Sequence, residues 1–241
     1  QPLHWVQTTW RGGKQPIKLA PYSKTMVEEH TKMFMSSLIL STSKKRGEFE
    51  LRNYDRFLYG MAPLPYLTGF APYILKDLID FEYLPSTTKA EQLSFRDRNK
   101  EGFKLAMKHG ADLFFGLSSV LVKIGESYAD SSNSSSSLPF PGNAKQAVKY
   151  VKAWYKKKIK KQELLPKDLF EFKGIVCGGT DSDTYKAKIE HYYGIKPLEI
   201  FGGTESASVA TETWIRNCLT LAPDVNFLEF IPESELQKES N

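Results

Sequence analysis

The sequence predicts an α/β fold with a mixed, largely parallel β-sheet core flanked by helices. Apolar strand-like runs alternate with helical segments from residue 98 onward, which is the order typical of this class. Two of the runs, IVCGGTD and LEIFGGTES, end in Gly-Gly, a hydroxyl and a carboxylate, and one helical segment lies between them. Residues 175–205 therefore predict a β-α-β unit. A right-handed crossover places both glycine-rich ends at one edge of a parallel sheet, where α/β proteins bind ligands.

The N-terminal part predicts a hairpin followed by a helix. Residues 4–23 form two strand-like arms around a loop, and Ser23 is suited to cap a helix whose inner face includes Met26, His30 and Phe34. Residues 60–69 contain prolines and glycines that exclude a regular helix. This apolar loop either caps the core or lines a pocket for an apolar substrate.

The middle of the chain predicts a helix, a strand and a second helix. The first helix covers residues 98–108 and ends at Gly110, the strand covers residues 111–117, and the second helix covers residues 118–128. The serine-rich stretch 130–137 is expected to be a mobile surface loop. It marks either a boundary near residues 130–142 between two lobes or an insertion within one domain.

An amphipathic helix is predicted over residues 144–161. Its apolar stripe is expected to pack inward and consists of Ala144, Ala147, Val148, Val151, Trp154, Tyr155 and Ile159. The lysines opposite, Lys145, Lys149, Lys152 and Lys156, continue into a lysine run that suggests nucleic acid or acidic lipid. A solvated helix face explains these charges more simply, because no stacking aromatics alternate with them. We therefore expect neither a nucleic-acid nor a membrane partner.

The composition is that of an ordinary globular protein. Hydrophobic residues make up 41% of the 241 residues and charged residues 25%, and the net charge is +5. No apolar run has the length of a membrane span. Two cysteines do not indicate a disulfide framework, so a reducing, cytoplasmic location is expected. The chain starts at Gln1 and stops in a polar tail, from which we expect either a piece of a longer protein or a chain whose partners are missing.

The loop of the N-terminal hairpin carries groups that suit phosphate binding. Hydroxyls, glycines and cations follow one another there: Thr8, Thr9, Arg11, Gly12, Gly13 and Lys14. Glycine permits close approach of the backbone, and lysine supplies positive charge. The same residues also suit a plain β-hairpin with a basic tip, and the loop alone does not distinguish the two.

Three loops in order, TTWRGGKQPIK, VCGGTD and FGGTES, precede LTLAPDVNFLEFIPE, a predicted closing strand that includes residues 222–232. This series resembles the acyl-adenylate-forming superfamily, and most closely its auxin-responsive-promoter branch, the acyl acid amido synthetases. The resemblance implies that residues 1–241 are part of the large N-terminal domain, without the C-terminal lid, and are inactive alone. It also implies that ATP activates a carboxylic acid as acyl-AMP and that an amine then displaces AMP.

The resemblance implies roles for single residues around ATP. The loop of residues 8–14 would hold the β- and γ-phosphates. Gly178, Gly179 and Thr180 would form a floor beside the adenine, and Phe201 would stack on its ring. The family's acyl pocket would draw on residues 61–70 and on residues 114–119.

The stretch after Phe201 would carry the chemistry. Gly202 and Gly203 are expected to turn the backbone sharply at the end of a buried strand. Thr204 would contact the α-phosphate and Glu205 would hold Mg²⁺, so these two are the candidate catalytic residues. Attack of a carboxylate on phosphorus needs such neutralisation by a metal and by fixed donors.

Two alternatives stay open. Trp10 and Arg11 stand where the family's phosphate loop has a small glycine and a hydroxyl. This departure motivates the hypothesis of a degenerate relative that acts as a binding or scaffold module. The other alternative is a coenzyme A ligase with a thiol acceptor, because the acceptor depends largely on the lid.

Overall fold

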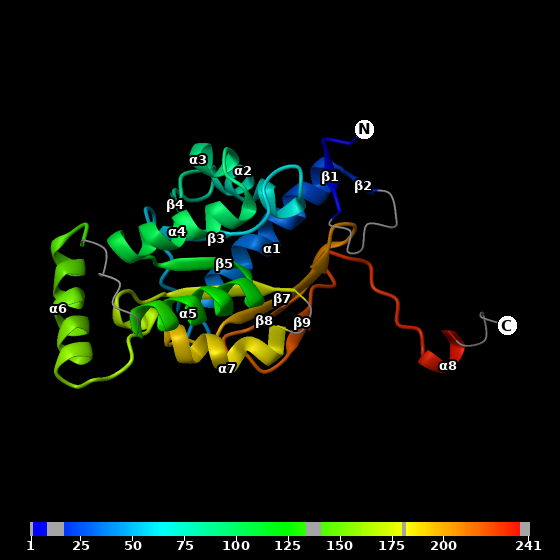
Figure 1. Cartoon of the computed structure of the whole chain (residues 1–241). Helices are drawn as coiled ribbons and strands as arrows, with labels where there is room; N and C mark the ends of the chain where they lie inside the picture. Colours follow the sequence, from blue (N-terminus) through cyan, green and yellow to red (C-terminus); the bar gives the residue numbers. More distant parts are fainter. Residues whose placement is uncertain (1, 9–16, 134–140, 180–181, 237–241) are drawn as a thin grey trace.

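The computed structural model describes residues 2–8, 17–133, 141–179 and 182–236. Its centre is a seven-stranded sheet in the order β4-β3-β5-β6-β7-β8-β9 (Figure 1). The strands are β3 (Arg56–Gly60), β4 (Glu82–Leu84), β5 (Leu113–Leu117), β6 (Gly174–Gly178), β7 (Leu198–Gly203), β8 (Ala207–Glu212) and β9 (Leu219–Leu221). Neighbours from β4 to β7 are parallel, and β8 pairs antiparallel with both β7 and β9. The predicted mixed, largely parallel α/β fold is confirmed.

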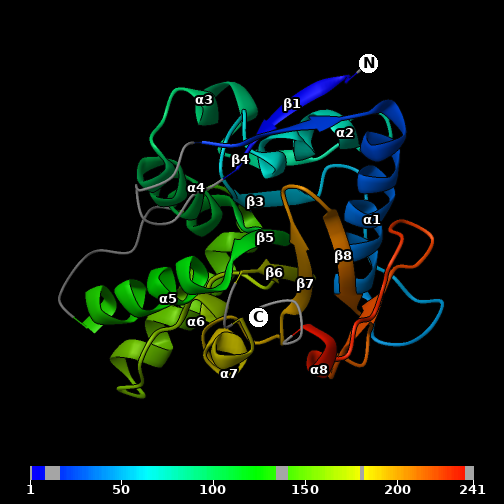
Figure 2. The ribbon, with the colours of Figure 1, turned by 90° about the vertical axis from the view of Figure 1, so that its right-hand side faces the viewer.

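Helices cover both faces of this sheet (Figure 2). On one side lie α4 (Phe95–His109), α5 (Ser118–Asn133), α6 (Ala144–Lys158) and α7 (Ser182–Tyr193), and on the other lie α1 (Lys24–Thr42) and α2 (Ala71–Leu75). Successive strand side chains alternate between the faces, so Phe114 packs with the first group while Leu113 and Phe115 pack with the second. All three are at most 2% exposed. The central strand β5 is therefore buried on both faces, as a parallel sheet requires.

The predicted helix ends are largely confirmed. Ser23 caps α1 and accepts a hydrogen bond from the Met26 amide at 3.2 Å. Ser94 caps α4 in the same way, so this helix begins earlier than the predicted residue 98. Gly110 follows α4 with a φ of 89°, a conformation that glycine adopts without strain. The remaining described helices are short: α3 (Thr87–Glu91), α8 (Glu233–Leu236) and the 3-10 helices η1 (Leu67–Phe70) and η2 (Pro166–Asp168).

The predicted N-terminal hairpin is present as β1 (His4–Gln7) and β2 (Leu19–Tyr22). Its inner face packs against Ala207 at the start of β8. The amide of Gln7 donates to the carbonyl of Pro65 at 3.0 Å, which ties the hairpin to the loop after β3. The packing against Ala207 places the hairpin beside the β7–β8 connection.

The orientation predicted for the amphipathic helix is wrong. The stripe expected to pack inward faces solvent in α6, where Val148 is 56%, Val151 67% and Trp154 54% exposed. The opposite face is buried because its polar groups satisfy carbonyls of other elements. Gln146 Nε2 donates to the Met107 carbonyl at 2.9 Å and to the Leu169 carbonyl at 2.7 Å, and Tyr150 also bonds the former.

Two of the lysines that were expected to face solvent lie on the inner side of this helix. Lys156 forms an ion pair of 2.7 Å with Asp168 of η2, and Lys149 lies 3.7 Å from Glu171. The helix-end carbonyls that need donors and these two partly exposed ion pairs together orient α6. The periodicity of the apolar residues did not reveal this, because it does not say which face has a partner.

The predicted closing strand is also wrong. β9 covers only Leu219–Leu221, and residues 222–232 are outside any described strand. Phe227 is 91% and Phe230 78% exposed. An apolar run becomes a strand only where a sheet edge hydrogen-bonds to it, and no described strand does so here.

The serine-rich stretch was expected to be a loop, but its first residues are helical. α5 continues to Asn133, while residues 134–140 lie outside the described part. Strands from both sides of residues 130–142 belong to the same sheet.

Both cysteines are free thiols, Cys177 buried and Cys218 exposed, which agrees with the absence of a disulfide framework. Within the described ranges, no helix combines the length and apolarity needed to cross a membrane.

Candidate functional site

The two glycine-rich strand ends lie side by side, as the β-α-β prediction requires. β6 and β7 are parallel neighbours in which Cys177 is opposite Glu199. A side chain added at Gly178 would contact Ile200 Cγ1 at 3.4 Å, so the ends of the two strands are in contact. Gly179 follows with a φ of 119°, which only glycine adopts readily. At this edge of the sheet Gly178 and Gly179 present backbone without side chains. A flat ligand can therefore approach the backbone closely.

Gly202 and Gly203 do not turn the chain, contrary to expectation. They are the last residues of β7, and the turn consists of Thr204, Glu205 and Ser206. A Cβ at Gly202 would lie 2.1 Å from the Ala207 carbonyl oxygen. Glycine at this position therefore permits close contact between β7 and β8, where the register shifts after Phe201.

An aromatic ring and a carboxylate are exposed beside these glycines. Phe201 is 59% exposed, and Glu205 is also exposed. β7 is therefore not the fully buried strand that was expected, since it is buried at Leu198 and becomes exposed toward its end. A flat apolar ring at the rim can stack on a base, and a solvent-facing carboxylate can reach a metal ion.

Tyr22 fixes the turn that carries Thr204 and Glu205. Its hydroxyl donates to the Thr204 carbonyl at 2.7 Å. Burial raises the pKa of the Tyr22 hydroxyl, and the negative charge of Glu205 raises it further. The hydroxyl thus remains a donor at physiological pH, and the hairpin holds the turn in place.

The predicted phosphate loop lies almost entirely outside the described residues. This applies to Thr9, Arg11, Gly12, Gly13 and Lys14, to Trp10, and to Thr180 of the second rim. Thr8 is described, and its amide donates to the Lys18 carbonyl at 3.0 Å. Thr8 therefore lies at the loop end of the hairpin, whereas Tyr22, which bonds Thr204, is opposite His4 at the other end.

A buried ion network joins α7 to the start of β7 and the end of β8. Lys186 of α7 contacts Glu199 of β7 and Glu212 of β8, each at 2.9 Å. Burial alone lowers the pKa of the Lys186 ammonium, but hydrogen bonds to Glu199, Glu212 and the nearby Asp183 outweigh it and raise the pKa. The Glu212 carboxylate also accepts from the Glu199 amide at 2.8 Å. The network joins three elements of the candidate site.

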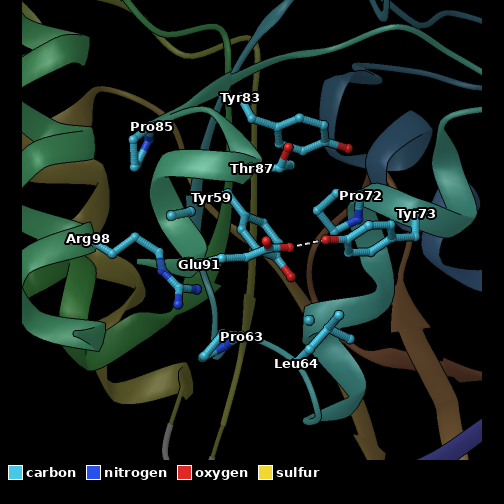
Figure 3. A pocket seen from close by; sticks show the side chains of 12 residues that line it. Tyr59, Pro63, Leu64, Pro72, Tyr73, Tyr83, Pro85, Thr87, Glu91 and Arg98 are labelled. Carbon is cyan, nitrogen blue, oxygen red and sulfur yellow. Dashed lines mark hydrogen bonds between the residues drawn. The ribbon is translucent and has the colours of Figure 1, made fainter. Parts of the chain in front are cut away.

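The loop after β3 lines a pocket, as one of the two sequence interpretations proposed (Figure 3). Pro63, Leu64 and Gly69 come from this loop. The expected contribution of residues 114–119 is absent from the lining of this pocket. Phe114 and Phe115 are in the core on opposite sides of the sheet.

Glu205 is the predicted Mg²⁺ ligand, and it is the residue at which the fit of the metal ion can be judged. No group of three or more His, Cys, Asp or Glu side chains among the described residues could hold a metal ion by itself. Mg²⁺ with a nucleotide needs one or two carboxylates, because phosphate oxygens and water complete its coordination. A single exposed carboxylate at the rim fits that mode of binding.

Sequence reasoning missed Arg98, Lys186 and Glu212, which are among the most buried charged residues. Arg98 and Lys186 stand in segments rich in other charges, and Glu212 is the single charge in a polar stretch, so nothing local marks any of them as buried. Their position is set by contacts distant in the sequence. An isolated sequence offers no signal for that.

Comparisons with known proteins give a structural likeness only. No protein-family model matches the chain, and no curated protein matches it. A malonyl-CoA ligase in a ternary product complex with methylmalonyl-CoA and AMP aligns with a TM-score of 0.49 and 16% identity, over 88% of this chain and 35% of that one. ATP-bound MatB from Rhodopseudomonas palustris aligns with a TM-score of 0.48 and 11% identity, over 87% of this chain and 31% of that one. The chain thus spans about a third of these proteins' length.

Proposed function

We propose that this chain is the nucleotide-binding core of a ligase that uses ATP to activate a carboxylic acid as acyl-AMP and transfers the acyl group to an amine. One observation carries the proposal. The ends of β6 and β7 place side-chain-free backbone, the exposed ring of Phe201 and the exposed carboxylate of Glu205 at one edge of the parallel sheet. This is the edge at which α/β folds bind nucleotides.

Each residue has a distinct part in the proposed reaction. Phe201 would orient the adenine by stacking, beside the glycine floor of the β6 end. The Thr204 hydroxyl would donate to the α-phosphate, while Tyr22 holds its backbone. When bound, Mg²⁺ neutralises phosphate charge, and Glu205 would hold it there. The acid's carboxylate oxygen attacks the α-phosphorus and pyrophosphate leaves. The amine then attacks the acyl carbon and AMP leaves.

The amine acceptor is proposed on the sequence resemblance, since the described residues hold no acceptor subsite that distinguishes amine from thiol. Transfer to the thiol of coenzyme A is the second candidate. Product analysis decides between them: an amide forms with an amino acid, or a thioester forms with coenzyme A.

Nucleotide binding is the first test, measured by calorimetry with MgATP on the 241-residue chain. Replacing Phe201 by Ala removes the stacking ring and should weaken binding at least about tenfold, since stacking on an aromatic contributes roughly 1–3 kcal/mol per base. Phe49→Ala is the matched control, because Phe49 is also 59% exposed but follows the end of α1, which lies at the start of β6 rather than at its glycine-rich end. No binding of MgATP by the unsubstituted chain would contradict the proposal and favour a scaffold module.

Catalysis is the second test, measured as pyrophosphate release over a panel of carboxylic acids by the protein that contains this chain. Glu205→Ala should reduce the Mg²⁺-dependent rate by at least about a hundredfold, because the phosphate charge is no longer neutralised. The control is Glu229→Ala, another exposed carboxylate distant from the rim in sequence. Equal rates for the two variants would remove Glu205 from the mechanism.

A further inference from the structure

A pocket separate from the glycine-rich rim lies at the ends of β3 and β4 (Figure 3). Its walls come from the loop after β3, from α2 and from α3, with one side chain of α4 entering from the opposite side. Most lining groups are apolar or aromatic: Tyr59, Pro63, Leu64, Gly69, Pro72, Tyr73, Tyr83, Pro85 and Ala90; Thr87, Glu91 and Arg98 complete it. The pocket has about 30 Å³ of room, which holds roughly two water molecules.

Arg98 is the unusual member of this pocket. It is only 1% exposed, yet it is a full cation. Its Nη1 donates to the Met61 carbonyl at 2.8 Å. Its Nε and Nη2 are buried and have no hydrogen-bond partner among the described residues. Buried donors are nearly always paired in folded proteins, so two unpaired donors on one guanidinium indicate a missing acceptor.

The protein's own acidic and hydroxyl groups at the pocket do not supply that acceptor. The Tyr73 hydroxyl donates to Glu91, and the Tyr59 hydroxyl donates to the Thr68 carbonyl. Glu91 is exposed at the mouth, where it accepts the Tyr73 hydroxyl. Glu91 and Arg98 are thus near enough to interact through charge but not joined by a bond.

The two unpaired nitrogens define the shape of the acceptor. Nε and Nη2 lie along one side of the planar guanidinium and donate in parallel, which matches the two oxygens of a carboxylate. A single cation with Glu91 nearby favours a monoanionic group over a phosphate dianion. Proline, leucine and tyrosine side chains around it exclude water and strengthen the charge-assisted bonds.

We infer that this pocket binds the carboxylate of a small organic acid through Nε and Nη2 of Arg98. The site does not depend on nucleotide binding, although it shares an edge of the sheet with the glycine-rich rim. Gly60 of β3 is opposite Gly116 of β5, and Leu117 of β5 is opposite Gly178 of β6. Two strand spacings of about 5 Å each therefore separate the two sites across the sheet.

The test is thermal unfolding and calorimetry of the 241-residue chain without ATP. Formate and acetate are titrated against sodium chloride at equal ionic strength, with inorganic phosphate as a different anion. Carboxylates should raise the unfolding temperature in a saturable way, and chloride and phosphate should not. No carboxylate-specific shift, or an equal shift with phosphate, would overturn the assignment.

Variants then separate a binding residue from a structural one. Arg98→Met fills similar space without charge and should weaken carboxylate binding at least about tenfold. It should leave the ligand-free unfolding temperature unchanged or higher, because it removes an unpaired buried charge. Arg98→Lys retains the charge but loses the parallel donors, so it should also bind weakly. Arg96→Met, an exposed change on the same helix, is the control.

Two results would contradict the inference at this stage. One is carboxylate binding by Arg98→Met as tight as that of the unsubstituted chain. The other is a ligand-free Arg98→Met chain that is folded but much less stable, which would show that the guanidinium serves the fold. Nitrogen NMR of the Arg98 side chain gives a direct readout, since its Nε–H signal should shift on addition of acetate.

Discussion

His30 shows how one buried side chain links the fold to pH. It lies on the inner face of α1, is 6% exposed, and its Nδ1 has no hydrogen-bond partner among the described residues. Burial lowers the pKa of His30 to about 4. The unfolded chain has the ordinary histidine pKa of about 6.5. The folded state therefore excludes a proton that the unfolded state binds between these values.

The expected consequence is a loss of stability as the pH falls. Above pH 6.5 the imidazole is neutral in both states and contributes no pH dependence. Below it only the unfolded chain gains the proton, so the free energy of unfolding should fall by about 2 kcal/mol between about pH 7 and about pH 5. Urea denaturation measures this, and the His30→Leu chain should lose that part of the dependence. An unchanged slope in the variant would contradict the burial of a neutral imidazole.

At the scale of the element, α6 determines its own orientation through polar groups. Its buried side carries Gln146, Tyr150 and Ala153, and its exposed side carries the apolar stripe. Hydrogen bonds to the end of α4 and an ion pair to η2 are the reason. In Figure 1, α6 stands at the margin of the molecule, away from the sheet.

Two substitutions two positions apart on α6 distinguish its sides. Ala153 is 1% exposed, so Ala153→Asp buries a carboxylate without a partner and should cost about 3 kcal/mol or more of unfolding free energy. Val151 is 67% exposed, so Val151→Asp should cost less than about 1 kcal/mol. Both introduce the same residue into the same helix, and urea denaturation compares them. A larger loss of unfolding free energy in Val151→Asp than in Ala153→Asp would support the orientation that the apolar periodicity predicts.

At the scale of the whole molecule, the network around Lys186 joins α7 to the two strands that flank the candidate turn. Its side chain is 11% exposed, and that of Glu212 is 1% exposed. Removing the cation would leave two carboxylates facing each other in a dry environment. Such a break costs far more than losing a pair at the surface.

Lys186→Met should therefore lower the free energy of unfolding by about 3–5 kcal/mol. Lys188→Met is the matched control on the same helix, since Lys188 pairs with Glu126 but is 58% exposed, and it should cost less than about 1 kcal/mol. Adding Glu212→Gln to Lys186→Met should recover part of the loss by removing one buried charge. Equal stability of the two lysine variants would show that the network contributes nothing to the fold.

Local patterns predicted most of the fold. The helix cap at Ser23, the glycine at position 110 and the apolar run of β5 depend on neighbours within a few residues, and these are confirmed. The prediction of a strand after β9 is wrong, because a strand must pair with a sheet edge and the described fold provides none there. Of the candidate sites, the sequence located the strand ends and the pocket-lining loop after β3, but not the buried Arg98.

The order of elements and the two glycine-rich ends at one sheet edge follow from the sequence by itself, because propensity, periodicity and the handedness of a β-α-β unit are local properties. Three features were decided only by the tertiary structure: the outward stripe of α6, the role of Gly202 against Ala207, and the burial of Arg98 with two unpaired donors. Each depends on which distant surface covers a residue. Such coverage depends on packing between residues that are far apart in the chain, which local sequence patterns do not describe.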